Sequence, residues 1–461
     1  MQASFFKDPI FRAFAVERPI ATLTQMVLRQ TLAPADIDQL FEQHAEQQYH
    51  RSLMFSALTC LVSGVVLGKH ASMNAGYKKM KEQLGVSITA VYEKLQRVEL
   101  LVVQQLVRQS YQQTVEICKE VGCVAHHDLP SYTTRILDGN WLSGTEHRLK
   151  ETRTSTAAPL PGKSLVVYDP RYNAVSDFFA MEDAYSQERS GLDDVIETLQ
   201  RHELWLADRN FCTLKFLYAI AAKSGVFVIR QHNQLHGIEK GKLRKIGESE
   251  TGVIYENKLL LPEHDGKQMT VRRVVVDLFE PTRDKEVEIV LLTNLPPTDA
   301  DAVVVSDLYR TRWKIETAFG HMTLALNCEV KPLCYPKAAL FCFASALMAY
   351  NAFAILKGAV AAEYGRRESE MLSHYYLALE ISEATDGMLV VLPEERWEEM
   401  DGVSLSDFAA EVRSIASGID MSRYRKSVRG PKKPPPKRTN KRKSVHVSTK
   451  RILDKRKENT C

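Results

Sequence analysis

Several features that mark other protein classes are missing from this sequence of 461 residues. The first eight residues, Met1 to Asp8, lack the charged and then apolar order of a secretion signal. The eight cysteines show no paired spacing, so we expect free thiols rather than a disulfide framework. No internal repeat is present. These absences favour a protein of a reducing compartment, and we expect a cytoplasmic location.

A standard metal-binding cysteine motif is also missing. Cys118, Cys123, His126 and His127 lie close enough in the sequence to form a zinc site. Their spacing is not that of known structural zinc sites, and Cys118 falls within a helical pattern. We therefore do not expect these four residues to bind zinc.

Charged residues are absent from two runs, 52–68 and 338–356. Each run approaches the ~20 residues that an apolar helix needs to cross a bilayer. Both runs are rich in Ala, Ser and Cys, and the second contains Tyr350 and Asn351. We interpret both as buried core helices and expect no contact with a membrane.

The net charge is only +4, but it is unevenly distributed. From Ser422 to Glu458 there are sixteen Lys and Arg residues against two acidic residues, a net charge of +14 that leaves −10 for the rest of the chain. This Pro-rich and Lys-rich segment cannot bury a core, so we expect it to be disordered. Basic tails of this kind most often bind polyanions.

The spacing of apolar residues divides the chain into segments. Up to about residue 125 it follows the three- and four-residue period of helices. From about residue 130, short apolar runs alternate with helical patterns, which predicts an α/β architecture. β-Branched runs between 253 and 292 predict an antiparallel insertion of three or four strands. The predicted divisions are a helical region at 1–125, an α/β core at 126–234 and 299–365, a β-strand insertion at 235–298, a helical region at 366–421 and a basic disordered tail at 422–461.

Residues 84–95, within the first region, resemble a helix-turn-helix. Gly85 would form the turn, and Ser87 would cap a second helix that carries Thr89, Tyr92 and Lys94 outward. Any two short helices joined at a glycine share this pattern. The sequence therefore leaves open a DNA-contacting segment and a plain helical hairpin.

The stretch from Tyr309 to Phe319 combines one carboxylate with basic and aromatic groups. We predict a helix that runs through Tyr309 into Leu326, on which Tyr309, Arg312 and Glu316 project from one face. A carboxylate beside phosphate-binding groups suits metal-dependent chemistry on a nucleic-acid backbone. One carboxylate cannot hold a catalytic metal alone, so partners are needed elsewhere in the chain.

Two further carboxylates, Asp138 and Asp208, occur at the ends of predicted strands. Cleaving or joining a phosphodiester requires stabilisation of charge on the phosphate and on the attacking and leaving oxygens. Two Mg²⁺ ions roughly 4 Å apart supply it when three acidic side chains hold them. Each carboxylate alone has a structural explanation: a turn at Asp138-Gly139, a helix cap at Asp208, an ion pair between Glu316 and Arg312. Their order on strand, strand and helix favours a joint site.

These segments resemble the catalytic core of DDE transposases from bacterial insertion sequences. The resemblance is to the group with a Tyr–Arg–Glu–Lys signature and a β-strand insertion before the glutamate. It implies an α/β fold with a ribonuclease H-like core, interrupted by an antiparallel β insertion and flanked by helical N- and C-terminal regions. The segments that carry the resemblance are Asp138-Gly139, Leu206-Ala207-Asp208-Arg209-Asn210-Phe211, Phe227-Val228-Ile229-Arg230, Leu292-Thr293-Asn294-Leu295 and Tyr309 to Phe319.

The resemblance also implies roles for individual residues. Asp138, Asp208 and Glu316 would be the catalytic triad that binds two Mg²⁺ ions, for which Mn²⁺ can substitute. Trp313 would contact DNA by stacking on a base. The residues that would contact DNA are Tyr309, Arg312, Trp313 and Arg230.

The implied function is that of a DNA transposase, which cleaves the ends of an insertion sequence and joins them to target DNA. It would act as a homodimer on double-stranded DNA at the nucleoid, with the region 1–125 and the basic tail as further DNA-binding parts. The sequence departs from the family pattern at two places: Thr323 stands where the signature lysine is expected, and Gly139-Asn140 follows the first aspartate where a threonine is common. Two alternatives stay open, a catalytically retired DNA-binding protein and a structure-directed nuclease of the same fold.

Overall fold

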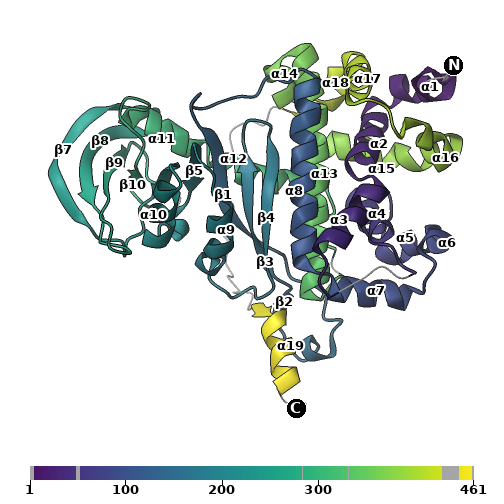
Figure 1. Cartoon of the computed structure of the whole chain (residues 1–461), viewed down its shortest axis with the longest axis horizontal. Helices are drawn as coiled ribbons and strands as arrows, with labels where there is room; N and C mark the ends of the chain where they lie inside the picture. Colours follow the sequence, from purple (N-terminus) through teal and green to yellow (C-terminus); the bar gives the residue numbers. More distant parts are fainter. Residues whose placement is uncertain (1–4, 48–51, 283, 331, 428–445, 459–461) are drawn as a thin grey trace, which may run out of the picture.

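A computed structural model describes residues 5–47, 52–282, 284–330, 332–427 and 446–458 (Figure 1). Its centre is one sheet with the strand order β4-β3-β1-β5-β6-β10-β9-β8-β7. The inserted strands extend from one end of this sheet, and helices α8 and α13 lie beside the other end (Figure 1). The fold confirms the predicted α/β class, with a ribonuclease H-like core, a β insertion and helical N- and C-terminal regions.

The N-terminal region is helical, as its apolar spacing predicted. Gly85 has a φ of 63°, which ends α6 in the left-handed region that favours glycine. The Ser87 hydroxyl accepts a hydrogen bond from the Ala90 N–H and caps α7. Lys94 does not point freely outward, because its Nζ donates to the Leu53 carbonyl at 2.6 Å. The helices are α1 (Pro9–Glu17), α2 (Pro19–Thr31), α3 (Pro34–His44), α4 (Phe55–Val66), α5 (Met73–Lys79), α6 (Lys81–Leu84), α7 (Ile88–Arg97) and α8 (Leu100–Glu120).

The core strands bury apolar side chains on both faces of the sheet. Ile136 and Leu206 join the larger core, which also contains buried residues of α8 and α13. Leu137 and Ala207, the next residues along each strand, join the core beneath α9 and α10. The elements of this part are β1 (Thr133–Trp141), β2 (Ala158–Leu160), β3 (Lys163–Asp169), β4 (Ala174–Met181), a 3₁₀ turn η3 (Glu188–Gly191), α9 (Leu192–Thr198), β5 (Glu203–Ala207), a 3₁₀ turn η4 (Arg209–Phe211), α10 (Leu214–Ala222) and β6 (Val226–Arg230).

The β insertion does not form a separate sheet. Its last strand, β10, pairs antiparallel with β6, with Leu291 opposite Arg230, so the insertion continues the core sheet. The outermost strand, β7, is exposed along almost its whole length. It was not among the runs that hydrophobicity identified. The inserted strands are β7 (Ile238–Glu248), β8 (Gly252–Leu260), β9 (Thr270–Leu278) and β10 (Glu288–Thr293).

Helix α13 (Pro336–Tyr364) is the central helix of the larger core. Among the described residues it is the one helix long and apolar enough to cross a membrane, and its apolar window is entirely buried inside the structure. Helix α4, in the other uncharged run, is also largely buried. Both findings agree with the interpretation of these runs as core helices.

The C-terminal part continues with helices packed near α13 and α2. The tail contains structure that the sequence did not predict: β11 pairs in parallel with β2, and α19 follows it. Acidic residues of the core hold this segment, since Asp183 accepts hydrogen bonds from Ser448 and Arg451, each at 2.7 Å. Residues 428–445 lie outside the described part of the chain. The remaining helices are α14 (Arg366–Glu370), α15 (His374–Val391), α16 (Glu394–Trp397), α17 (Leu405–Ser417), α18 (Met421–Tyr424) and α19 (Thr449–Glu458), after β11 (His446–Ser448).

Candidate active site

Asp138 and Asp208 lie where two neighbouring parallel strands part. Strands β1 and β5 are paired as far as Leu137 and Ala207, and each of these two residues is followed by an aspartate. The Asp138 carboxylate accepts a hydrogen bond from the Gly139 N–H at 2.9 Å. The Asp208 carboxylate accepts one from the Asn210 N–H at 2.8 Å, which caps the η4 turn. Asp208 directly follows β5, as predicted. The predicted strand end at Leu137 is wrong, because β1 continues to Trp141 and Asp138 is paired there with Val166 of β3.

Glu316 lies in the first turn of α12 (Trp313–Ala325). The single helix predicted to run through Tyr309 into Leu326 is instead two, because α11 (Ala302–Arg310) ends before Thr311. The Thr311 hydroxyl donates to the Leu308 carbonyl at 2.7 Å, and the backbone there forms tighter bonds three residues apart. Such local side-chain bonds compete with the regular helical pattern. The junction sets the direction from which Arg312 and Glu316 approach β1.

Arg312 connects two of the three carboxylates. Its Nη1 donates to Asp138 Oδ2 at 3.1 Å, and its Nη2 donates to Glu316 Oε1 at 2.7 Å. The arginine is only 7% exposed, and its guanidinium also lies over the rings of Tyr309 and Trp313. In this arrangement Arg312 faces the carboxylates of the site, rather than being free for a DNA phosphate as the sequence suggested.

The electrostatics of the cluster are dominated by Asp138. Burial raises the pKa of its carboxyl to about 7, and the neighbouring Asp208 and Glu316 add to the rise. The Arg312 guanidinium and the Gly139 N–H oppose the rise without cancelling it. A carboxylate with so high a pKa in a group of three marks a place where further positive charge would be stabilising.

The donor chemistry of these residues fits a divalent cation. Carboxylate oxygens are the ligands that Mg²⁺ and Mn²⁺ prefer, and the raised pKa of Asp138 shows that Arg312 alone does not neutralise the cluster. Within the described ranges, no three His, Cys, Asp or Glu side chains converge on a single metal position. Asp138, Asp208 and Glu316 would hold the ions after Arg312 has moved from between Asp138 and Glu316.

The other predicted DNA-contacting residues lie beside this cluster. Tyr309 is 8% exposed, whereas Trp313 is 60% exposed. Both line a groove of about 460 Å³ between the inserted strands and the α11–α12 junction. Arg230, at the end of β6, forms an ion pair with Glu286 at 2.6 Å, and Arg209 shares the same carboxylate at 2.9 Å. Sequence reasoning missed Glu286, because it lies far along the chain and carries no local motif.

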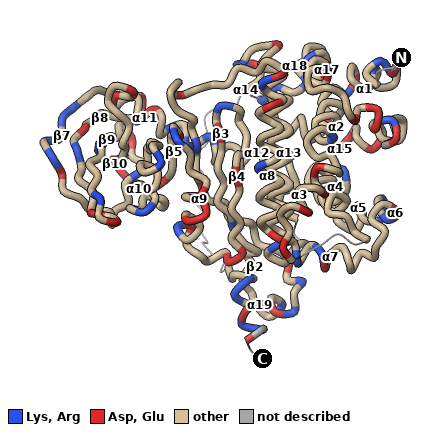
Figure 2. The backbone as a smooth tube through the Cα atoms, viewed as in Figure 1, with Lys and Arg blue, Asp and Glu red and all other residues tan. Residues whose placement is uncertain are grey.

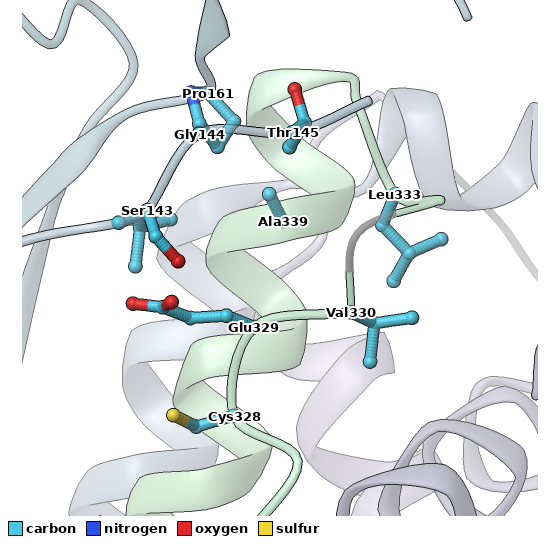
Figure 3. Close-up of a pocket in the computed structure, with 10 residues that line it drawn as sticks. Ser143, Gly144, Thr145, Pro161, Cys328, Glu329, Val330, Leu333 and Ala339 are labelled. Carbon is cyan, nitrogen blue, oxygen red and sulfur yellow. The ribbon is translucent and has the colours of Figure 1, made fainter. Parts of the chain in front are cut away.

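A second cavity, near the start of α13, is too small for a nucleotide. Its volume is about 10 Å³, enough for roughly one water molecule. Figure 3 shows Glu329 extending toward Ser143 at the edge of this cavity, and burial raises the pKa of the Glu329 carboxyl. The cavity contains none of the predicted catalytic residues.

The fold and the acidic cluster together define a class of protein. A ribonuclease H-like sheet with carboxylates on two adjacent strands and on one facing helix is the arrangement of an enzyme that acts on nucleic-acid phosphodiesters. A family model described as "Transposase DDE domain" matches residues 133–352. The match identifies residues 133–352 as a transposase DDE domain; enzymes with this domain act on DNA and generally use divalent metals. No curated protein matches the chain.

Proposed function

We propose that this protein cleaves the ends of an insertion sequence and joins them to target DNA by two-metal phosphoryl transfer. The observation that carries the proposal is the cluster of Asp138, Asp208 and Glu316 at one edge of the sheet, with the pKa of Asp138 raised to about 7. All three residues lie within the matched transposase domain. The proposal places the protein in the group of transposases with the Tyr–Arg–Glu–Lys signature. Its natural cofactor would be Mg²⁺, for which Mn²⁺ can substitute.

In the proposed reaction, a water molecule attacks the phosphorus at the transposon end. The bond from phosphorus to the 3′ oxygen breaks, and that oxygen leaves as a 3′-hydroxyl with the proton that the water has lost. The 3′-hydroxyl then attacks a target phosphodiester in line and loses its proton, while the target's own bond from phosphorus to its 3′ oxygen breaks and releases a target 3′-hydroxyl. Bound metal ions would stabilise the charge on the phosphate and on the attacking and leaving oxygens. Asp138, Asp208 and Glu316 would hold these ions, and Arg312 pairs with Asp138 and Glu316 in the absence of DNA and metal.

DNA contacts in this proposal surround the cluster. The exposed ring of Trp313 offers a stacking surface for a base, and Tyr309 lines the same groove. Arg230 and Arg312 would each bind a DNA phosphate in exchange for the carboxylate that it now pairs with. Two ends must be joined together, so the active form is a homodimer on DNA in the cytoplasm, at the nucleoid.

The central test is substitution of one aspartate. We expect Asp208→Ala to abolish Mg²⁺-dependent cleavage of a linear duplex that carries the gene's flanking DNA, because the loss of one acidic ligand removes the charge that holds the ions. Binding of the same duplex should persist. Asp194→Ala, an exposed acidic residue of α9, is the matched control and should cleave normally. Equal cleavage by the Asp208→Ala protein would disprove the triad.

A second candidate function is a transposase-derived protein that binds DNA without cleaving it. The observation in its favour is Thr323, which replaces the expected lysine on α12 and whose hydroxyl donates to the Phe319 carbonyl within the same helix. In the assay above, this candidate predicts binding without any cleavage by the unsubstituted protein. A structure-directed nuclease would cleave but would form no joined products.

A further inference from the structure

Glu188 lies against the catalytic strand from the opposite face of the sheet. Side chains alternate along β1: Asp138 points toward Arg312 and α12, whereas position 139 faces the side of α9. A Cβ built on Gly139 would lie 2.3 Å from Glu188 Oε1. The Glu188 carboxylate therefore contacts the backbone of β1 directly, one residue beyond Asp138. It can do so only because position 139 has no side chain.

The same carboxylate is hydrogen-bonded to the loop that carries the second aspartate. Asn210 Nδ2 donates to Glu188 Oε2 at 3.2 Å, while the Asn210 backbone N–H donates to Asp208 Oδ1 at 2.8 Å. One oxygen of Glu188 thus lies at the backbone beside Asp138, and the other is linked through Asn210 to Asp208.

These contacts occur where the backbone no longer holds the two strands together. The parallel pairing of β1 and β5 ends at Leu137 and Ala207. Beyond that point β1 stays paired with β3, but no backbone pair joins it to the Asp208 loop. Glu188 and Asn210 connect β1 to this loop directly after the last backbone pair.

We propose that Glu188 is a positioning residue of the catalytic centre. It acts through Asn210 on Asp208, and it fixes the Asp208 loop against β1 so that the two aspartates are spaced to share a divalent cation. The inference rests on the proposed function, because the spacing of these aspartates matters only if they hold metal ions together. Its mechanism requires a hydrogen-bond acceptor at Glu188 rather than a negative charge.

The probe for this role is Mn²⁺ binding to the full-length protein, measured by calorimetry without DNA. Glu188→Ala should weaken Mn²⁺ binding about tenfold or more, as is usual when a residue that orients a metal ligand is lost. Glu188→Gln should bind within about threefold of the unsubstituted protein, because its amide oxygen still accepts from Asn210. Glu197→Ala, at an exposed position of α9, is the matched control and should have no effect.

Two further substitutions, at Asn210 and at Gly139, distinguish a positioning role at the metal site from a general effect on the stability of the protein. Asn210→Ala should weaken Mn²⁺ binding as Glu188→Ala does, and the double variant should be no worse than either, since both break one connection. Gly139→Ala should have a similar effect, because the new Cβ displaces the Glu188 carboxylate. In a Glu188→Ala background, Gly139→Ala should then have little further effect. If the loss of Mn²⁺ affinity across these variants correlates with a lower midpoint of thermal unfolding, the proposal is contradicted.

The outcomes also distinguish this inference from the proposed function. If Glu188→Gln binds Mn²⁺ as weakly as Glu188→Ala, the negative charge is what matters and the positioning role is wrong. If Glu188→Ala binds Mn²⁺ normally and cleaves the flanking-DNA duplex at the normal rate, Glu188 has no role at the centre. If the unsubstituted protein binds Mn²⁺ but never cleaves, the proposed function fails instead.

Discussion

For Asp138, burial in the fold opposes the ionised state that metal binding would require. Its carboxyl is 17% exposed, and burial beside Asp208 and Glu316 raises its pKa from 3.8 to about 7. Between these two values the native protein retains a proton that the unfolded chain releases. The contribution of Asp138 to the free energy of unfolding therefore falls as the pH rises from about 4 to 7 and changes no further above 7. A shift of about three pKa units corresponds to roughly 4 kcal/mol.

The free-energy cost of ionising the buried Asp138 carboxyl leads to a prediction for Asp138→Asn in metal-free buffer. At pH 4 the amide resembles the protonated carboxyl, so the variant should be about as stable as the unsubstituted protein. At pH 8 it should be more stable by up to about 4 kcal/mol, because it carries no charge to bury. Urea unfolding across this pH range measures the difference, with Asp194→Asn as the exposed control. A difference that does not change with pH would show that Asp138 ionises normally.

The sequence predicted some site residues and missed others for a physical reason. Asp138 and Asp208 were identifiable as candidates because each directly follows a short apolar run, and the parallel pairing of β1 with β5 ends just before both aspartates. Glu188 was not identifiable from the sequence, because its contact with Gly139 depends on how the segment before α9 crosses the face of the sheet opposite Asp138. The direction of Arg312 was also missed, because it depends on the junction between α11 and α12.

Among the elements, buried helices and strands were easier to predict than exposed ones. The apolar runs that became β5, β6 and α13 are almost fully buried, and hydrophobicity reports burial. Strand β7 is rich in Lys and Gly and is exposed, so its sequence has no apolar alternation, and pairing with β8 alone makes it a strand. Strand β11 likewise depends on its partner, β2.

A buried polar residue of α13, Asn351, links this helix to the sheet. Asn351 is fully buried; its Oδ1 accepts from the Val175 N–H at 2.7 Å, and its Nδ2 donates to the Val175 carbonyl at 3.0 Å. The same Nδ2 lies 3.3 Å from Ser110 Oγ on α8. One side chain thus joins α13, α8 and β4, and completes the hydrogen bonding of a backbone position in β4.

We expect Asn351→Leu to destabilise the protein although it makes the helix more apolar. The substitution leaves the N–H and carbonyl of Val175 buried without partners, which costs roughly 2–5 kcal/mol in total. Ser345→Ala is the matched control on the same helix, because the Ser345 hydroxyl donates only to the Phe341 carbonyl of its own helix, and it should change stability by less than about 1 kcal/mol. Chemical unfolding measures both, and equal stabilities would show that water or rearrangement satisfies Val175.

At the scale of the whole molecule, charge is separated along the chain. The segment 422–458 carries +14 and the rest carries −10. Figure 2 shows basic residues on α19 and along β7, with acidic and basic residues both distributed along the other elements. The basic side chains of α19 are partly neutralised by the core: Arg451 pairs with Asp183 at 2.7 Å, and Lys450 lies 3.8 Å from Glu182. The eight Lys and Arg residues between 429 and 443 remain as the largest concentration of positive charge in the sequence.

These eight residues should therefore set the salt dependence of DNA binding. Each phosphate that a basic side chain neutralises releases condensed counterions and contributes about 0.9 to the slope of log affinity against log salt concentration. Replacing all eight with Gln should make the slope shallower by several units and weaken binding at physiological salt by orders of magnitude. Fluorescence anisotropy with a labelled duplex, at potassium chloride concentrations from about 0.05 to 0.3 M, measures both quantities.

Replacement of Lys450 and Arg451 with Gln provides the comparison, since those charges already face carboxylates and release fewer counterions on binding DNA. It should change the slope less per charge removed. An unchanged slope in the eightfold variant would assign nonspecific DNA binding to the folded body instead. Because that body is acidic overall, the binding charge would then have to lie in local basic surfaces such as β7, where Lys240, Lys242 and Arg244 are exposed.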